Sequence, residues 1–228
     1  MNRKYVVAGI AFALAGSAAV IATQAAEQAP RRPMSFFVTS TTPSGSGNLG
    51  GLAGADKICQ DLAAAAGAGG KTWHAYLSSQ TTNAGPGANA RGRIGTGPWY
   101  NAKGVMMAAN VADLHGDNQR DRNNFQKANI LDEKGTLIKG AGDMPNQHDI
   151  LTGSDSDGRA FPAGIDTTCN NWSSDTTANR AMLGHADRTG GGNISWNSVH
   201  MSADCTKEGL IRTGGAGHLY CFATNNDN

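Results

Sequence analysis

The sequence has no excess of charge of either sign and is poor in aromatic residues. In 228 residues Lys and Arg number 19 and Asp and Glu 18, a formal net charge of +1 at pH 7, and Phe, Trp and Tyr make up 6%. The basic residues are scattered and form no stripe, so the charge pattern argues against a nucleic-acid-binding surface or one for an anionic membrane. We therefore expect no nucleic-acid partner.

The sequence also lacks the motifs of common hydrolytic and metal-dependent enzymes. It has neither G-x-S-x-G nor a lone reactive cysteine. No two histidines have the H-x-x-x-H or H-E-x-x-H spacing that places two imidazoles on one helix face. The six histidines are scattered and read as structural or exposed residues: His74, His115, His148, His185, His200 and His218. We predict that the protein is not an enzyme. A hydrolase would need a pocket that joins a histidine to a nucleophile.

The N-terminus has the features of a secretory signal. Three polar residues that include Arg3 and Lys4 precede a mostly apolar stretch that ends near residue 22, and small residues follow before Glu27. We assign residues 1–26 to a signal peptide, residues 27–35 to a leader and residues 36–226 to one domain. An uncleaved membrane anchor is the alternative, but after cleavage the chain would not be embedded in a membrane. The protein is therefore expected to be exported, either periplasmic or secreted.

The four cysteines fit this compartment. Cys59, Cys169, Cys205 and Cys221 are even in number and have no C-x-x-C spacing. In an oxidising compartment we expect two disulfides, and from spacing alone all three pairings stay open.

Glycine is abundant, with 31 residues, and many Asn, Asp, Ser and Thr residues accompany it. Such residues favour turns, so the chain is expected to be rich in loops. Apolar residues spaced as on one helix face predict a helix from residue 52 to about 66. Short apolar or alternating runs predict strands, at residues 36–38, 72–79, 129–131, 136–138, 195–196, 209–211 and 218–222. The fold class is therefore α+β.

Several motifs resemble those of endostatin domains. Gly50-Gly-Leu-Ala-Gly-Ala-Asp56 with Cys59, followed by Trp73-His-Ala-Tyr-Leu-Ser-Ser79, resembles their opening helix, cysteine and Ala-x-Leu-Ser-Ser strand. Downstream, Gly153-Ser-Asp-Ser-Asp-Gly158 with Cys169 and Trp172 resembles a further endostatin stretch. The resemblance extends from about residue 36 to 224, with gaps between residues 81 and 150.

The resemblance implies a C-type-lectin-like fold with two nested disulfides. In that fold the first cysteine pairs with the last and the middle two pair together, which would give Cys59–Cys221 and Cys169–Cys205. The stretch from Asp143 to Ser154 also resembles small exported bacterial proteins. Such proteins are often called lectins.

Sugar-binding C-type lectins hold Ca²⁺ through a Glu-Pro-Asn-like loop and a Trp-Asn-Asp strand, because a hard cation takes oxygen ligands. Met144-Pro145-Asn146 and Trp196-Asn197-Ser198 are partial matches, in which Met144 and Ser198 replace acidic ligands. Of the nearby carboxylates, Asp149, Asp155 and Asp157 are the ones that could hold Ca²⁺. Turns on solvated loops are the simpler explanation of these acidic residues. The predicted ligand-binding set is Asn146, Asp149, Asp155, Asp157 and Asn197.

We therefore predict an exported, lectin-like binding protein that recognises a glycan or another envelope or extracellular ligand. The step from fold to function rests on the resemblance. A structural or adhesive envelope protein that binds another protein is the main alternative.

Overall fold

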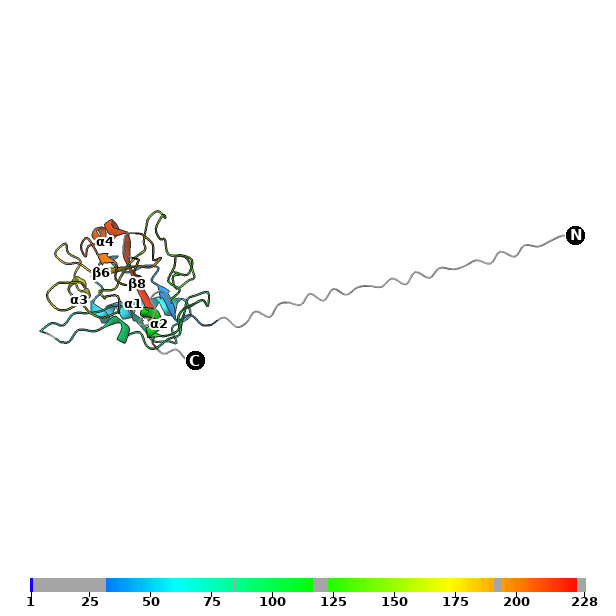
Figure 1. Cartoon of the computed structure of the whole chain (residues 1–228), viewed down its shortest axis with the longest axis horizontal. Coiled ribbons are helices and arrows are strands. Elements are labelled where there is room, and N and C mark those ends of the chain that lie inside the picture. The colour runs from blue at the N-terminus through cyan, green and yellow to red at the C-terminus, as the bar shows by residue number, and fades with distance from the viewer. Residues whose placement is uncertain (2–31, 84, 117–122, 191–193, 225–228) are drawn as a thin grey trace. The chain divides into compact units, whose positions relative to one another are not determined.

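A computed structural model describes Met1 and residues 32–83, 85–116, 123–190 and 194–224 (Figure 1). Contacts divide the chain into two units, Met1–Pro30 and Arg31–Asn228. The predicted signal peptide and its cleavage site lie outside the described residues. Within them, no helix has the length and apolar character needed to cross a membrane.

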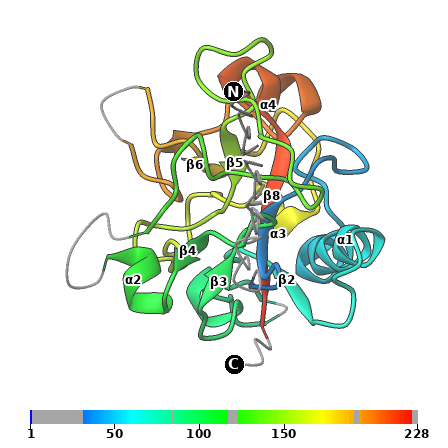
Figure 2. The ribbon, with the colours of Figure 1, turned by 90° about the vertical axis from the view of Figure 1, so that its right-hand side faces the viewer.

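The described chain is an α+β fold built on a six-stranded mixed sheet. Its central strand, β8 (Gly215–Ala223), pairs antiparallel with β1 (Phe36–Val38) and β2 (Trp73–Ala75). The same strand pairs in parallel with β5 (Asp149–Leu151), which continues through β6 (Met182–His185) to β7 (His200–Met201). A separate pair joins β3 (Trp99–Tyr100) to β4 (Met106–Ala108). Figure 2 shows β8 running through the middle of the domain.

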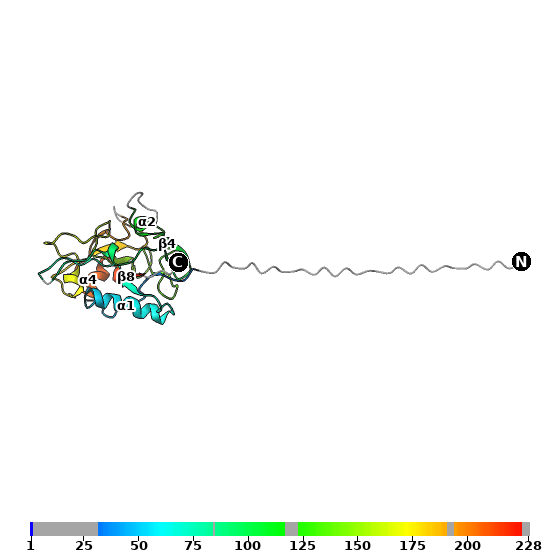
Figure 3. The ribbon, with the colours of Figure 1, turned by 90° about the horizontal axis from the view of Figure 1, so that it is seen from below.

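Helix α1 (Gly51–Ala65) packs beside β2 and β8. Ala55, Cys59 and Ala63, four residues apart, form its buried stripe. The Cys59–Cys221 disulfide ties this stripe to β8, and a second disulfide joins Cys169 to Cys205. The implied pairing is therefore confirmed. Figure 3 shows α1 from below, along the side of the domain.

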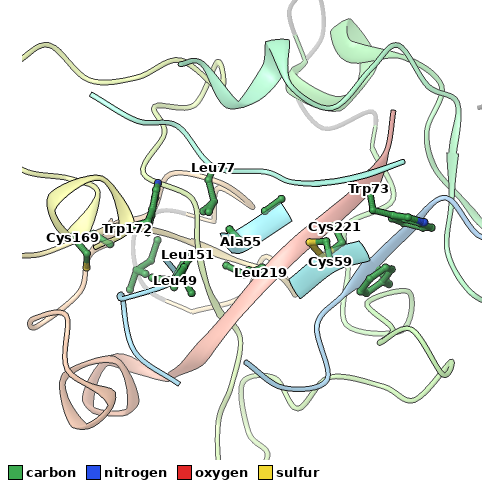
Figure 4. Packing of buried hydrophobic residues seen from close by; sticks show 14 of the residues in the cluster. Leu49, Ala55, Cys59, Trp73, Leu77, Leu151, Cys169, Trp172, Leu219 and Cys221 are labelled. Carbon is green, nitrogen blue, oxygen red and sulfur yellow. A yellow bond between two sulfur atoms is a disulfide. The ribbon is translucent and has the colours of Figure 1, made fainter. Parts of the chain in front are cut away.

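Two hydrophobic cores lie on opposite faces of β8, because successive residues of a strand point to opposite faces. Leu219 and Cys221 enter the core that α1 covers, whereas Tyr220 and Phe222 enter the other. Figure 4 shows the first core. Its main members come from many segments of the chain: Leu49, Ala55, Cys59, Trp73, Leu77, Leu151, Cys169, Trp172, Leu219 and Cys221.

The remaining elements are short and lie between long irregular segments. They are the 3₁₀ turn η1 (Ala90–Gly92), α2 (Val111–His115), α3 (Cys169–Trp172) and α4 (Lys207–Thr213). The predicted abundance of loops is borne out by this arrangement.

The segment α3 is a left-handed turn rather than an ordinary helix. All four of its residues have positive φ, from 48° at Cys169 to 66° at Trp172. Such a conformation costs about 1–2 kcal/mol per non-glycine residue. Hydrogen bonds oppose this cost: Trp172 Nε1 donates to the Ser78 carbonyl, and the Asn171 amide bonds both backbone groups of Gln80.

Four strand predictions need correction. Residues 209–211 belong to the helix α4, because Thr206 caps its start through the Gly209 amide and Gly214 ends it in a left-handed conformation. Residues 195–196 form no strand, and the nearest one is β7. Residues 129–131 and 136–138 form a short hairpin rather than full strands, with the bridge Leu131↔Leu137 and backbone hydrogen bonds from Ile138 to Ile130 and from Asp132 to Thr136.

Candidate functional site

A polar pocket lies between the loop around residues 155–157 and the segment 194–198. Its volume is about 580 Å³. His115, Asn123 and Arg188 contribute to its wall, as do Phe161 and several backbone segments. Three of the five predicted ligand-binding residues line it: Asp155, Asp157 and Asn197.

Asn197 holds the two sides of this pocket together. It is 1% exposed, and its Nδ2 donates to the Tyr76 hydroxyl and to the carbonyls of Asp155 and Ser156. Its Oδ1 accepts from the Ser195 hydroxyl at 2.9 Å. The side chain is therefore engaged at both ends, and its hydrogen bonds brace the pocket wall.

The two aspartates differ in their freedom to bind. Oδ1 of Asp155 accepts from the backbone amides of Asp157 and Arg159, which makes it the anchor of the turn. Asp157 is exposed and lines the pocket. Of the predicted residues, Asp157 is thus the best placed to contact a solute.

A buried chain of hydrogen bonds lies beneath the pocket. Asn197 donates to the Tyr76 hydroxyl, which donates to Nε2 of His115 at 2.8 Å, and Nδ1 of His115 donates to the Val111 carbonyl. Burial raises the pKa of Tyr76 well above its ordinary value, so the phenol stays protonated. Because both ring nitrogens of His115 are used in this way, the ring is poorly suited to activate a nucleophile.

The other two predicted residues do not line this pocket. Asn146 is half-buried, and its Oδ1 accepts from the His148 amide at 3.3 Å. Asp149 is the first residue of β5 and has a fully buried side chain. The proposed calcium ligands Asp149, Asp155 and Asp157 are thus not gathered into one site.

Asp149 lies instead in a cluster of histidines. Among the described residues, donor atoms of His148, Asp149 and His185 lie within 4.8 Å of one another. Oδ1 of Asp149 is 3.4 Å from Nε2 of His148 and 3.2 Å from Nε2 of His185. Nε2 of His200 lies 3.1 Å from Nε2 of His185 and 3.7 Å from the same carboxylate oxygen. We call these four residues the His/Asp cluster; they could hold a metal ion.

Asp187 orients one ring of the His/Asp cluster. Its Oδ1 accepts from Nδ1 of His148 at 2.9 Å, and its Oδ2 accepts from the Ala141 amide. Burial lowers the pKa of His148, but the hydrogen bond and charge of Asp187, with the charge of Asp149, raise it above the ordinary value. Burial likewise opposes ionisation of Asp187, yet its bonds with His148, Ala141 and Thr189 bring its pKa below the usual range.

Sequence reasoning missed this cluster because its histidines are far apart in the chain. Only strand pairing brings them together: Asp149 pairs with His185, and Leu183 pairs with His200. The adjacent pair His148-Asp149 was the one local signal, and spacing motifs do not detect it.

The tryptophans are core residues. Trp99, Trp172 and Trp196 are at most 4% exposed, so none offers a free face to a sugar. Phe161, which is half-buried and lines the pocket, is the aromatic residue placed to do so.

Comparison of the chain with protein-family models and with curated proteins found no match.

Proposed function

We propose that this chain is an exported, non-catalytic binding protein with a C-type-lectin-like fold, and that it binds a glycan in the polar pocket. The observation that carries this proposal is the pocket of about 580 Å³ that Asn197 braces and Asp157 borders. A pocket of this size suits a small ligand.

The disulfides support the fold and the compartment. Their pairing is the one that the endostatin resemblance implies, and disulfides persist in oxidising surroundings such as the periplasm or the medium. The first strand, β1, pairs antiparallel with the last, β8, so the two ends of the described domain lie side by side.

The chemistry of the pocket supports a polar ligand. Asp157, Ser156 and Ser198 offer oxygen acceptors and donors that match sugar hydroxyls, and Phe161 offers an apolar surface. The engagement of both nitrogens of His115 favours binding over catalysis.

The test is a glycan array followed by calorimetric titration of the oxidised protein, in Ca²⁺ and in chelator. We expect Asp157→Asn to weaken binding of any glycan found by about 10-fold, the effect of losing one charge-assisted hydrogen bond. Asp175→Asn is the matched control, because Asp175 is equally an exposed aspartate but does not line the pocket.

Absence of glycan binding by the wild-type protein under both conditions would reject the proposal. Capture of a protein ligand that Asp157→Asn leaves unchanged would instead favour an adhesive role.

A further inference from the structure

We propose that the His/Asp cluster is a binding site for one Zn²⁺ ion, held by His148, Asp149 and His185, which ties β5 to β6, with His200 beside it at the edge of the site. This goes beyond the proposed glycan-binding function and involves a different set of residues.

The register of the sheet explains how the cluster forms. Asp149 and His185 are directly opposite each other in the β5–β6 pair, so their side chains share one face. His200 pairs with Leu183, two residues from His185, and therefore lies on the same face of the sheet. His148 joins them from the position just before β5.

The distances suit a single ion. Two ligands of a tetrahedral zinc, each 2.0–2.1 Å from the metal, lie about 3.3 Å apart. Two contacts among these three ligands are close to this value: 3.2 Å for Asp149–His185 and 3.4 Å for Asp149–His148. All three donor atoms lie within 4.8 Å of one another. Nε2 of His200 is 3.1 Å from that of His185 and 3.7 Å from the Asp149 carboxylate but lies outside this group.

The tautomers fixed by neighbouring groups point lone pairs into the cluster. His148 donates its Nδ1 proton to Asp187, and His200 donates its Nδ1 proton to the Met201 carbonyl at 3.1 Å. In a neutral ring, Nε2 then carries a lone pair. The Nε2 lone pairs of His148 and His200 both lie near the Asp149 carboxylate. A cation placed among these electron-rich atoms would stabilise the arrangement. A carboxylate that orients a ligating histidine in this way is typical of zinc sites.

Asp149 supplies the second, independent sign of a ligand. Its side chain is fully buried, and none of the described residues hydrogen-bonds to either carboxylate oxygen. A buried carboxylate without such partners is costly unless a cation compensates it.

The donor set selects the type of metal. Imidazole nitrogen suits Zn²⁺ and other late transition metals, whereas Ca²⁺ requires oxygen ligands. Three protein ligands leave one position of a tetrahedral ion for water or for the neighbouring His200. The side chain of His200 is 38% exposed and gives the ion a path from solvent.

The test is metal analysis of the purified, oxidised protein after dialysis against Zn²⁺ and removal of free metal, together with Co²⁺ substitution. We expect one Zn²⁺ per chain, a visible absorption spectrum of tetrahedral Co²⁺, and a melting temperature that rises with free Zn²⁺. Asp149→Asn and His185→Gln should abolish stoichiometric binding. Asp187→Asn should weaken it by about 10–100-fold, as expected for a positioning residue.

His74→Gln is the matched control, since His74 lies outside the cluster and bonds the Arg93 carbonyl; it should bind zinc like the wild type. Because a variant at a buried position could fail to fold, His148→Gln provides a third ligand variant, and the far-ultraviolet circular dichroism spectrum of each variant is compared with that of the wild type. Less than a tenth of an equivalent of Zn²⁺ in the wild type, with no shift in melting temperature, would overturn the proposal. Equal zinc binding by the wild type and all three ligand variants would overturn it as well.

Discussion

Nδ1 of His148 donates to Oδ1 of Asp187 at 2.9 Å, while Nε2 of the same ring faces Asp149. Asp187 also accepts from the amides of Ala141 and Thr189, so one buried carboxylate connects the loop after residue 139 to the strands that carry the cluster.

Loss of this carboxylate should destabilise the fold even without metal. We predict that Asp187→Ala lowers the free energy of unfolding by about 3–5 kcal/mol, because it leaves buried partners unpaired. Asp143→Ala, which breaks a more exposed ion pair with Lys127 in the same region, should lower it much less, because solvent screens that pair. Urea unfolding in chelator measures both, and equal losses would contradict the prediction.

Asp56 connects α1 to β2. Its Oδ1 accepts from the Ala75 amide and its Oδ2 forms an ion pair with Arg93 at 2.6 Å. We expect Asp56→Ala to destabilise the protein by about 3 kcal/mol, since both buried donors lose their acceptor. Asp61→Ala on the same helix removes only the exposed pair with Lys57 and should cost no more than about 0.5 kcal/mol. Similar urea midpoints for the two variants would disprove this role of Asp56.

Asn171 should contribute more to stability than its neighbour Asn170. Both have φ near 54°, but only Asn171 bonds the backbone of Gln80 through its side chain. Asn171→Ala should cost about 2–3 kcal/mol, the sum of two hydrogen bonds and the left-handed backbone cost. Asn170→Ala should cost less, about 1 kcal/mol, because it adds to the backbone cost only the loss of an exposed hydrogen bond to the Ser173 hydroxyl. Thermal unfolding of both variants separates the two contributions. Equal decreases in melting temperature would show that the hydrogen bonds of Asn171 to Gln80 contribute nothing to stability.

His218 should make the protein less stable in acid. Burial lowers its pKa to about 4, against the opposing charges of Glu133 and Asp132. Below the ordinary pKa of about 6.5 the unfolded chain binds the proton first, so stability falls as the pH drops from 6.5 towards 4. At pH 4.5 the loss from this residue is about 2–3 kcal/mol. Urea unfolding of the wild type and of His218→Gln at pH 7 and pH 4.5 measures this loss, which should be absent from the variant. If both proteins lose the same free energy of unfolding between the two pH values, another group is responsible.

The disulfides should differ in their contribution. The loop closed by Cys59–Cys221 spans 162 residues and that of Cys169–Cys205 spans 36. The chain-entropy relation gives about 5 and about 4 kcal/mol, respectively. Unfolding of the two paired Cys→Ala variants in oxidising buffer tests this order, and a greater loss from the shorter loop would reverse it.

Local signals in the sequence sufficed for the parts of the fold that depend on neighbouring residues. The apolar spacing of α1, the short strand β1 and the even set of cysteines were read directly. The resemblance added the disulfide pairing. The same local reasoning wrongly predicted a strand within α4, because a short apolar run is compatible with either a helix or a strand. The capping residues Thr206 and Gly214 are the local signals that favour the helix.

The candidate sites depended on contacts between distant segments. Asp157 and Asn197 were predicted separately, but only the fold shows that Asn197 braces the pocket wall that carries Asp157. Asp149, His185 and His200 lie on three neighbouring strands and His148 directly precedes the first of them, and the register of those strands decides that their side chains meet. The sequence by itself determined the α+β class and the number of disulfides through local periodicity and composition. The tertiary structure alone decided which polar residues face one another, because non-local pairing is not written in the spacing of residues along the chain.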